Sequence, residues 1–171
     1  QYSGTRPEDQ AMVAAGVRSG RAVPRDWAQA TRDVDAFDAK ADALAVLGGL
    51  GVSVDNLQVI AEAPDWYHPG RAGSLRLGPQ TVLAHFGEIH PGVLRRMDVK
   101  GPIAGFEVLL DALPKPKARK GAARPHLDLS SLQPVARDFA FVVDRDVAAD
   151  AVVRAARGAD KKLIVDVRVF D

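Results

Sequence analysis

The sequence predicts an α+β fold in which an antiparallel sheet predominates, and three observations carry this prediction. Residues 74–77 and 81–87 are strand-like runs separated by Gly78-Pro79-Gln80, a sequence typical of a hairpin turn. Residues 103–110 alternate in polarity, as a half-buried strand does. Residues 33–50 repeat apolar side chains every three or four positions, the period of an amphipathic helix. Strands that follow one another with few helices between them indicate the α+β class.

The helix predicted over residues 33–50 has signals at both ends. Acidic side chains gather near its start, at Asp33, Asp35 and Asp38, where they favour the helix dipole. The glycine-rich range 48–51 marks its end. Because these glycines follow a helix rather than open one, they do not form a phosphate-binding loop. The apolar side chains that the period places on one face are Val34, Phe37, Ala41, Leu44 and Leu47.

Three shorter elements complete the first part of the chain. Residues 11–17 form an apolar run that is either a buried strand or a helical turn, because short runs do not distinguish the two. Residues 57–62 read as a strand that ends before Pro64. Pro91 can occupy the first position of a helix, which predicts a short helix after it.

Composition excludes several classes of protein. Among 171 residues the formal net charge is +1, so composition alone does not indicate nucleic-acid binding. There is no cysteine, which excludes disulfides, thiolate metal sites and cysteine nucleophiles. No apolar run approaches the ~20 residues that span a bilayer. The chain begins with Gln1 rather than Met and has no apolar leader, so we expect it to be a piece of a longer protein.

The second part of the chain begins after a basic, proline-rich stretch. Residues 113–126 contain PKPKARKGAARP, whose prolines and like charges keep it extended, so we predict a linker. Beyond it, residues 137–143 read as a strand, 148–157 as a helix and 163–170 as an alternating strand. This order predicts an incomplete βαβ unit of ferredoxin-like type.

The histidines raise the possibility of a metal-dependent hydrolase. His85, Glu88 and His90 lie in HFGEIH, which looks superficially like a zinc motif. The spacing of two histidines five apart on a strand points their rings to opposite faces, however, and Pro91 argues against a helix. We therefore assign no metal-binding residue and no catalytic residue. A metal analysis without bound zinc or iron would eliminate the hydrolase hypothesis.

RNA binding is the candidate function that the residues support better. Basic residues concentrate after the linker, where they would contact phosphates. Phe139, Phe141 and Phe170 could stack on bases, but the shared parity of Phe139 and Phe141 on a strand favours a place in the core. Arg145 and Arg168 belong to the same basic set. The residues that we predict to bind RNA are Arg137, Arg154, Arg157, Lys161 and Lys162.

Two sequence blocks together resemble a known family. Residues 66–111, WYHPGRAGSLRLGPQTVLAHFGEIHPGVLRRMDVKGPIAGFEVLLD, resemble the catalytic-like domain of the β-subunit family of bacterial phenylalanyl-tRNA synthetases. Residues 134–171, which contain PVARDFAFVVDRDV and KKLIVDVRVFD, resemble the start of the ferredoxin-fold anticodon-binding domain that ends the same subunit. The two blocks occur in the family's order. The resemblance favours a strand rather than a helical turn at residues 11–17.

The resemblance implies a domain organisation and a non-catalytic role. Residues 1–112 would form a class II synthetase-like domain, 113–126 a linker, and 127–171 the first half of the anticodon-binding domain. Class II active sites bind ATP through arginines, but Gly105-Phe106-Glu107 is followed by Val108 instead. Arg71 and Arg76 also lack the expected acidic companions in the sequence.

The same resemblance implies partners and cofactors. The catalytic α subunit would join this β subunit in an (αβ)₂ tetramer in the cytoplasm and charge tRNA(Phe) with phenylalanine. ATP and Mg²⁺ would be bound elsewhere in that holoenzyme, with no cofactor on this piece and no membrane or DNA as partner. The piece alone would be inactive, supporting the α subunit and positioning tRNA. The alternative is a free-standing synthetase-like module that binds RNA or regulates without belonging to a tetramer.

Overall fold

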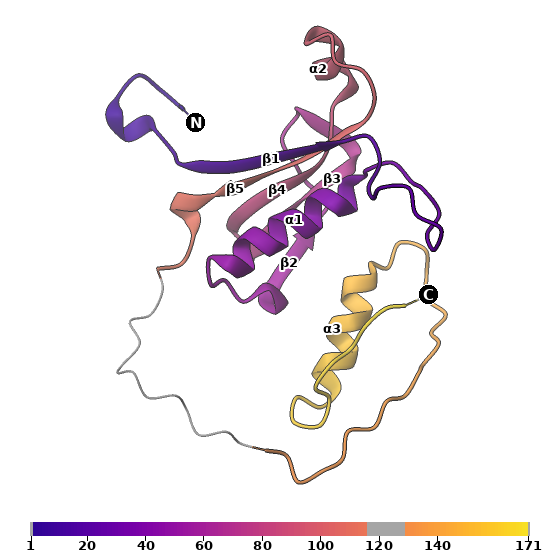
Figure 1. Ribbon diagram of the computed structural model, residues 1–171. Coiled ribbons are helices and arrows are strands. Elements are labelled where there is room, and N and C mark those ends of the chain that lie inside the picture. The colour runs from indigo at the N-terminus through magenta and orange to yellow at the C-terminus, as the bar shows by residue number, and fades with distance from the viewer. Residues whose placement is uncertain (1, 116–128, 171) are drawn as a thin grey trace. The chain divides into compact units, whose positions relative to one another are not determined.

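The computed structural model describes residues 2–115 and 129–170 (Figure 1). The chain divides into two compact units, residues 1–118 and 119–171. Within the described residues of these units, no helix is long and apolar enough to cross a bilayer. Of the predicted linker over residues 113–126, positions 116–126 lie outside the described residues.

The first unit is built on an antiparallel sheet. Within residues 2–115 it has five strands in the order β1-β5-β4-β3-β2. The predicted hairpin is formed by β3 and β4, and the ambiguous run at residues 11–17 belongs to a strand, as the resemblance favoured. This sheet confirms the predicted α+β class. Its strands are β1 (Val13–Ser19), β2 (Leu57–Ile60), β3 (Tyr67–Leu77), β4 (Thr81–Ile89) and β5 (Ile103–Leu109).

Helix α1 (Ala36–Gly49) packs on one face of this sheet (Figure 1). It begins three residues later than predicted, because Asp35 is its N-cap and accepts hydrogen bonds from the backbone N–H groups of Phe37 and Asp38 at 2.8 and 3.2 Å. Near the glycine-rich end, Gly51 has a φ of +85°, a left-handed conformation that glycine adopts readily.

The apolar face of α1 agrees with the predicted one only in part. Leu47 is buried and Leu44 packs against the core, as predicted. Phe37 is 74% exposed and Ala41 is also exposed, whereas Ala39 and Ala43 are buried. The short alanine side chains let the helix lie close to the sheet, where packing is dense. A regular period predicted the helix, but which face turns inward depends on the fit against the strands. Burial of a leucine such as Leu47 stabilises a fold by about 1.5–3 kcal/mol.

Two rows of side chains cross the sheet on opposite faces, because side chains alternate along paired strands. In one row, Leu75 pairs with Ala84, and both are fully buried in the core that α1 covers. In the neighbouring row, Ser74, His85 and Glu107 pair across three strands. The sheet therefore has an apolar face under the helix and a face that carries polar side chains.

The β3–β4 ladder contains a close approach of two backbones. Gly87 pairs with Ala72 and has a φ of +152°, in the region that favours glycine. A Cβ at this position would lie 2.7 Å from the carbonyl oxygen of Arg71. After β4, helix α2 (Pro91–Arg96) begins at the predicted proline, with His90 as its N-cap.

The second unit contains helix α3 (Ala149–Ala159), as the sequence predicts. The predicted strands over residues 137–143 and 163–170 are not formed, since the structure assigns no strand within residues 129–170. A strand needs a hydrogen-bonded neighbour. In a split βαβ unit the two strands beside the helix leave room for a further strand between them. No such strand lies within residues 129–170, so both segments remain without a ladder.

Candidate nucleic-acid interface

Helix α3 carries two of the predicted RNA-binding arginines, and both are already paired. The Nε atom of Arg154 lies 3.0 Å from Oδ2 of Asp150, one helical turn earlier. The Nη2 atom of Arg157 lies 3.6 Å from Oδ1 of Asp166 and donates to the carbonyl oxygen of Val167 at 3.4 Å. These exposed ion pairs leave the guanidinium groups accessible and contribute little stability.

The two predicted lysines follow α3 directly, on a turn held by one carboxylate. Oδ1 of Asp160 accepts hydrogen bonds from the backbone N–H groups of Lys162 and Leu163 at 2.8 and 3.0 Å. Both hydrogen bonds lower the pKa of Asp160, and the bond from Leu163 has the larger effect. The side chains of Lys161 and Lys162 are exposed, and neither forms an ion pair within the described part of the unit. Their ammonium groups are thus available to an anion.

Arg137 lies apart from the other four predicted residues. It belongs to the segment that precedes α3, and its Nη1 donates to the carbonyl oxygen of Ala136 at 3.1 Å. No carboxylate pairs with Arg137 or with Arg145 in residues 129–170. The structure therefore gathers four predicted residues on and after one helix, and leaves Arg137 exposed on another segment.

The phenylalanines of the second unit are exposed rather than in a core, which corrects the prediction from strand parity. Phe139 and Phe141 lie with ring centroids 6.4 Å apart, nearly stacked on each other. Phe141 also lines an apolar cavity of about 450 Å³ against α3, with Val147 and Val152. Because no ladder forms here, parity does not direct these rings inward.

The polar row of the first unit centres on Glu107. Its Oε2 accepts from Nε1 of Trp66 at 3.1 Å and from the hydroxyl of Tyr67 at 3.4 Å. Burial, reinforced by the nearby Glu107 charge, raises the pKa of the Tyr67 phenol. Burial lowers the pKa of His85, whose Nδ1 is buried without a hydrogen-bond partner in residues 2–115. No local sequence pattern predicts this cluster, because its members come from three separate segments.

The structure does not bring His85, Glu88 and His90 together as a metal site. His85 belongs to the polar row, whereas Glu88 pairs with Ala104 at a position of opposite parity on β4. Nδ1 of His90 accepts from the backbone N–H of Gly92 at 3.0 Å. Among residues 2–115 and 129–170, no three His, Cys, Asp or Glu side chains are arranged to hold a metal ion.

Arg71 and Arg76, which have no expected acidic partner nearby in the sequence, each form an ion pair with a carboxylate in the structure. Nη1 of Arg71 lies 3.1 Å from Oε2 of Glu88, and Nη2 of Arg76 lies 2.6 Å from Oε2 of Glu62. Both partners come from neighbouring strands or loops, which is why sequence proximity did not reveal them. Beside them, a cavity of about 400 Å³ is lined by residues that include Glu62 and His68.

Comparison with known proteins gives matches along both units. A family model described as the phenylalanyl tRNA synthetase beta chain CLM domain matches residues 2–110, and one described as the ferredoxin-fold anticodon binding domain matches residues 130–171.

Curated relatives match almost the whole chain. Phenylalanine–tRNA ligase beta subunits of Paramagnetospirillum magneticum and Rhodospirillum rubrum are 60% and 57% identical over 171 residues, which is 100% of this chain and 21% of each relative. The corresponding subunit of Bradyrhizobium diazoefficiens is 51% identical over 174 residues, with 99% of this chain and 22% of the relative covered. The chain thus spans about a fifth of the length of these relatives.

Proposed function

The chain belongs to the phenylalanyl-tRNA synthetase β-chain family, and on this premise we propose that it forms part of the β subunit of a phenylalanine–tRNA ligase. In this role it contributes no catalytic residue, supports a catalytic α subunit and binds tRNA(Phe) while the holoenzyme charges that tRNA with phenylalanine. The observation that carries the proposal is the order of two family matches in one chain, a synthetase β-chain domain followed by an anticodon-binding domain.

The proposed holoenzyme is an (αβ)₂ tetramer of the cytoplasm that consumes ATP and uses Mg²⁺. We assign neither ATP nor Mg²⁺ to a residue of this chain; among the described residues, no three His, Cys, Asp or Glu side chains are placed to hold a metal ion. The proposed domain boundaries are 1–112 for the synthetase-like domain, 113–126 for the linker and 127–171 for the anticodon-binding part.

The proposed tRNA contacts are Arg137, Arg154, Arg157, Lys161 and Lys162. Two features support them. Arg137 and the two lysines have no ion pair in the described residues, and Arg154 and Arg157 are held in solvent-accessible pairs that a phosphate can join or replace. Contacts of this kind follow the backbone rather than read bases, so they position the tRNA.

The proposal is tested with the full-length natural chain and the catalytic subunit encoded in the same genome. We expect the two proteins to co-purify and, with ATP and Mg²⁺, to attach radiolabelled phenylalanine to tRNA(Phe), while either protein alone does not. Tyrosine serves as the control amino acid. A full-length chain that binds tRNA but neither associates with the catalytic subunit nor supports charging would favour the free-standing RNA-binding module instead.

A further inference from the structure

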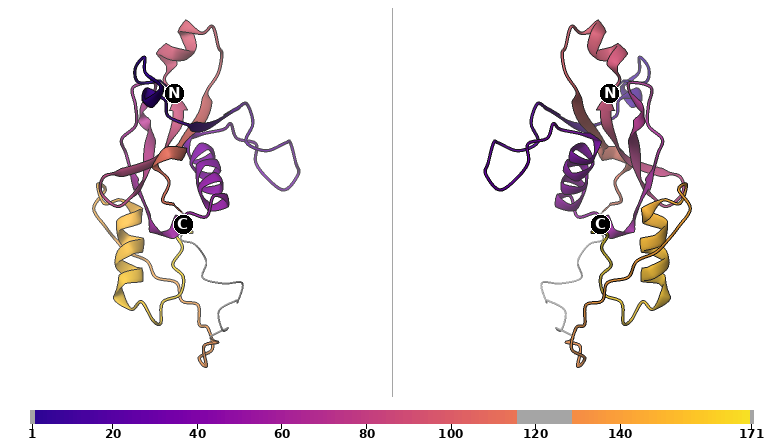
Figure 2. Two further views of the ribbon diagram at one scale, coloured as in Figure 1. Left: turned by 90° about the vertical axis from the view of Figure 1, so that its left-hand side faces the viewer. Right: turned by 90° about the vertical axis from the view of Figure 1, so that its right-hand side faces the viewer.

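A hairpin-like arm joins β1 to α1. Backbone hydrogen bonds fix its base, and its tip extends away from the sheet (Figure 2). We call residues 20–34 the β1–α1 arm. At its base Arg21 and Asp33 form an antiparallel bridge, and the backbone N–H of Val34 donates to the carbonyl oxygen of Gly20 at 2.9 Å. Figure 2 shows the arm extending away from the sheet and from α1. The first unit therefore buries Val34 at the base of the arm in its core and leaves the tip of the arm extended.

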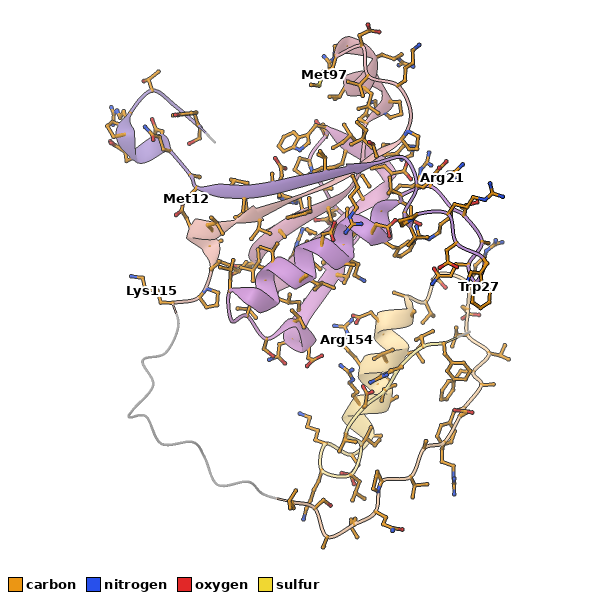
Figure 3. All side chains as sticks on the ribbon, viewed as in Figure 1. Met12, Arg21, Trp27, Met97, Lys115 and Arg154 are labelled. Atoms are coloured by element: carbon orange, nitrogen blue, oxygen red, sulfur yellow. The ribbon has the colours of Figure 1, made fainter. Side chains whose placement is uncertain are left out.

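The tip of the arm presents a large aromatic side chain. Trp27 is 99% exposed (Figure 3), whereas the chain's other tryptophan, Trp66, is 40% exposed and donates a hydrogen bond to Glu107. Oδ1 of Asp26 accepts from the backbone N–H of Ala28 at 2.5 Å, so a local turn fixes the backbone on both sides of the indole. An exposed indole held in this way keeps a large apolar area available for a partner to bury.

The charges around the arm favour a protein partner over RNA. Residues 18–42 contain four arginines and one lysine against five aspartates, which balance to zero. Arg18 and Arg32 are committed to Asp42 and Asp38. A surface that binds a polyanion carries excess positive charge, and this one does not. Tryptophan flanked by arginine is instead typical of the residues that dominate protein–protein affinity.

We propose that the β1–α1 arm is a docking element that inserts Trp27 into an apolar pocket of the catalytic subunit. This inference rests on the proposed function, which supplies that subunit as the partner. Arg21 and Arg25 have no ion-pair partner among residues 2–115, so the pocket that accepts the indole is rimmed by carboxylates. The apolar neighbours of the indole on the arm, Val23, Pro24 and Ala28, complete the contact.

The test uses the full-length natural chain and measures its affinity for the catalytic subunit. Trp27→Ala should weaken binding at least about tenfold, as expected of a central aromatic anchor, while Trp27→Phe should retain most of the affinity. Met97→Ala is the matched control, because Met97 is also largely exposed but lies directly after α2, as the C-cap of that helix. Equal melting temperatures of all variants show that the fold is intact, as expected where the replaced side chains contact solvent.

Hydrogen exchange of residues 20–34 identifies the occupant directly. We expect slower exchange in this segment when the catalytic subunit is added, and no change when tRNA alone is added. Slowing by tRNA alone, slow exchange in the isolated full-length chain, or unchanged affinity of Trp27→Ala would each overturn the proposal. If the unaltered full-length chain fails to bind the catalytic subunit, the proposed function itself is wrong. If Trp27→Ala binds the catalytic subunit as tightly as the unaltered chain, only the proposal about the arm is wrong, and the proposed function stands.

Discussion

Arg32 and Asp38 form a two-pronged ion pair, with Nη1 2.7 Å from Oδ2 and Nη2 2.7 Å from Oδ1. Arg32 lies near the C-terminal end of the β1–α1 arm, and Asp38 lies in the first turn of α1, where it also accepts from the backbone N–H of Asp35 at 2.9 Å. One carboxylate thus joins the base of the arm to the capping of the helix. The direction in which the arm leaves the first unit depends on this contact.

This ion pair makes stability sensitive to acid. The Arg32 guanidinium, as the largest cause, lowers the pKa of Asp38 from 3.8 to about 2. Because the folded-state pKa lies below the unfolded one, the contribution is present above about pH 4 and is lost as pH falls towards 2. Asp38→Asn should lower the free energy of unfolding by about 1 kcal/mol at pH 7. Urea denaturation should show this difference shrinking below pH 4, with Asp33→Asn as the control; a difference independent of pH would contradict it.

The close approach at Gly87 predicts a costly substitution. In Gly87→Ala the new Cβ would meet the Arg71 carbonyl oxygen, and the residue would keep a φ of +152°. We expect a loss of about 2 kcal/mol or more in the free energy of unfolding. Gly49→Ala is the matched control, because a Cβ there meets nothing within 4 Å at the end of α1. It should raise stability by about 0.5–1 kcal/mol. Equal effects of the two changes in denaturant titrations would refute this account.

The buried, hydrogen-bonded phenol of Tyr67 should resist ionisation at high pH. Burial and then Glu107 raise the pKa of Tyr67 above its usual value of 10.0. The neutral phenol therefore contributes stability below pH 10 that is lost as pH rises through the folded-state pKa. In the folded chain, Tyr67→Phe should leave the phenolate absorbance change between pH 9 and about 11 unaltered. If the substitution halves that change, Tyr67 ionises normally and the contact with Glu107 is absent.

The lysines after α3 predict a salt-dependent effect on tRNA binding. In the full-length ligase, replacing Lys161 and Lys162 with alanine should weaken tRNA(Phe) binding roughly threefold to tenfold and reduce the salt slope of log affinity by about 1–2. Lys100→Ala serves as the control, since Lys100 is exposed in the first unit. Filter binding at several salt concentrations gives both quantities. A double variant with the unaltered slope would place the phosphate contacts elsewhere.

The sequence predicted the elements of the first unit well, because their signals are local. The Gly78-Pro79-Gln80 turn, the proline that opens α2 and the aspartates that cap α1 each act within a few residues. The inward face of α1 was predicted less well, with Phe37 expected inside and found outside. Periodicity identifies a helix, but the choice of face depends on how closely the sheet can be approached.

The contacts that cross between segments could not be predicted. Glu107 meets Trp66 and Tyr67 from about forty positions away, and Arg71 meets Glu88 across the β3–β4 ladder. The strands expected in the second unit do not form within residues 129–170, for a related reason. Alternation predicts a strand at residues 163–170, but a ladder also needs a partner strand, which a pattern within one segment does not supply.

The paired rows Leu75–Ala84 and Ser74–His85 have a consequence for how this sequence can change in length. They are offset by one position and face opposite sides of the sheet. A one-residue insertion or deletion in β4 that is not absorbed by a bulge, such as the register shift already present between Leu75 and Arg76, would exchange the rows, placing an imidazole beneath α1 and aliphatic side chains outside. A substitution that keeps the character of its row is therefore tolerated where an uncompensated one-residue change in length is not, and length variation is best accommodated in the loops between the strands.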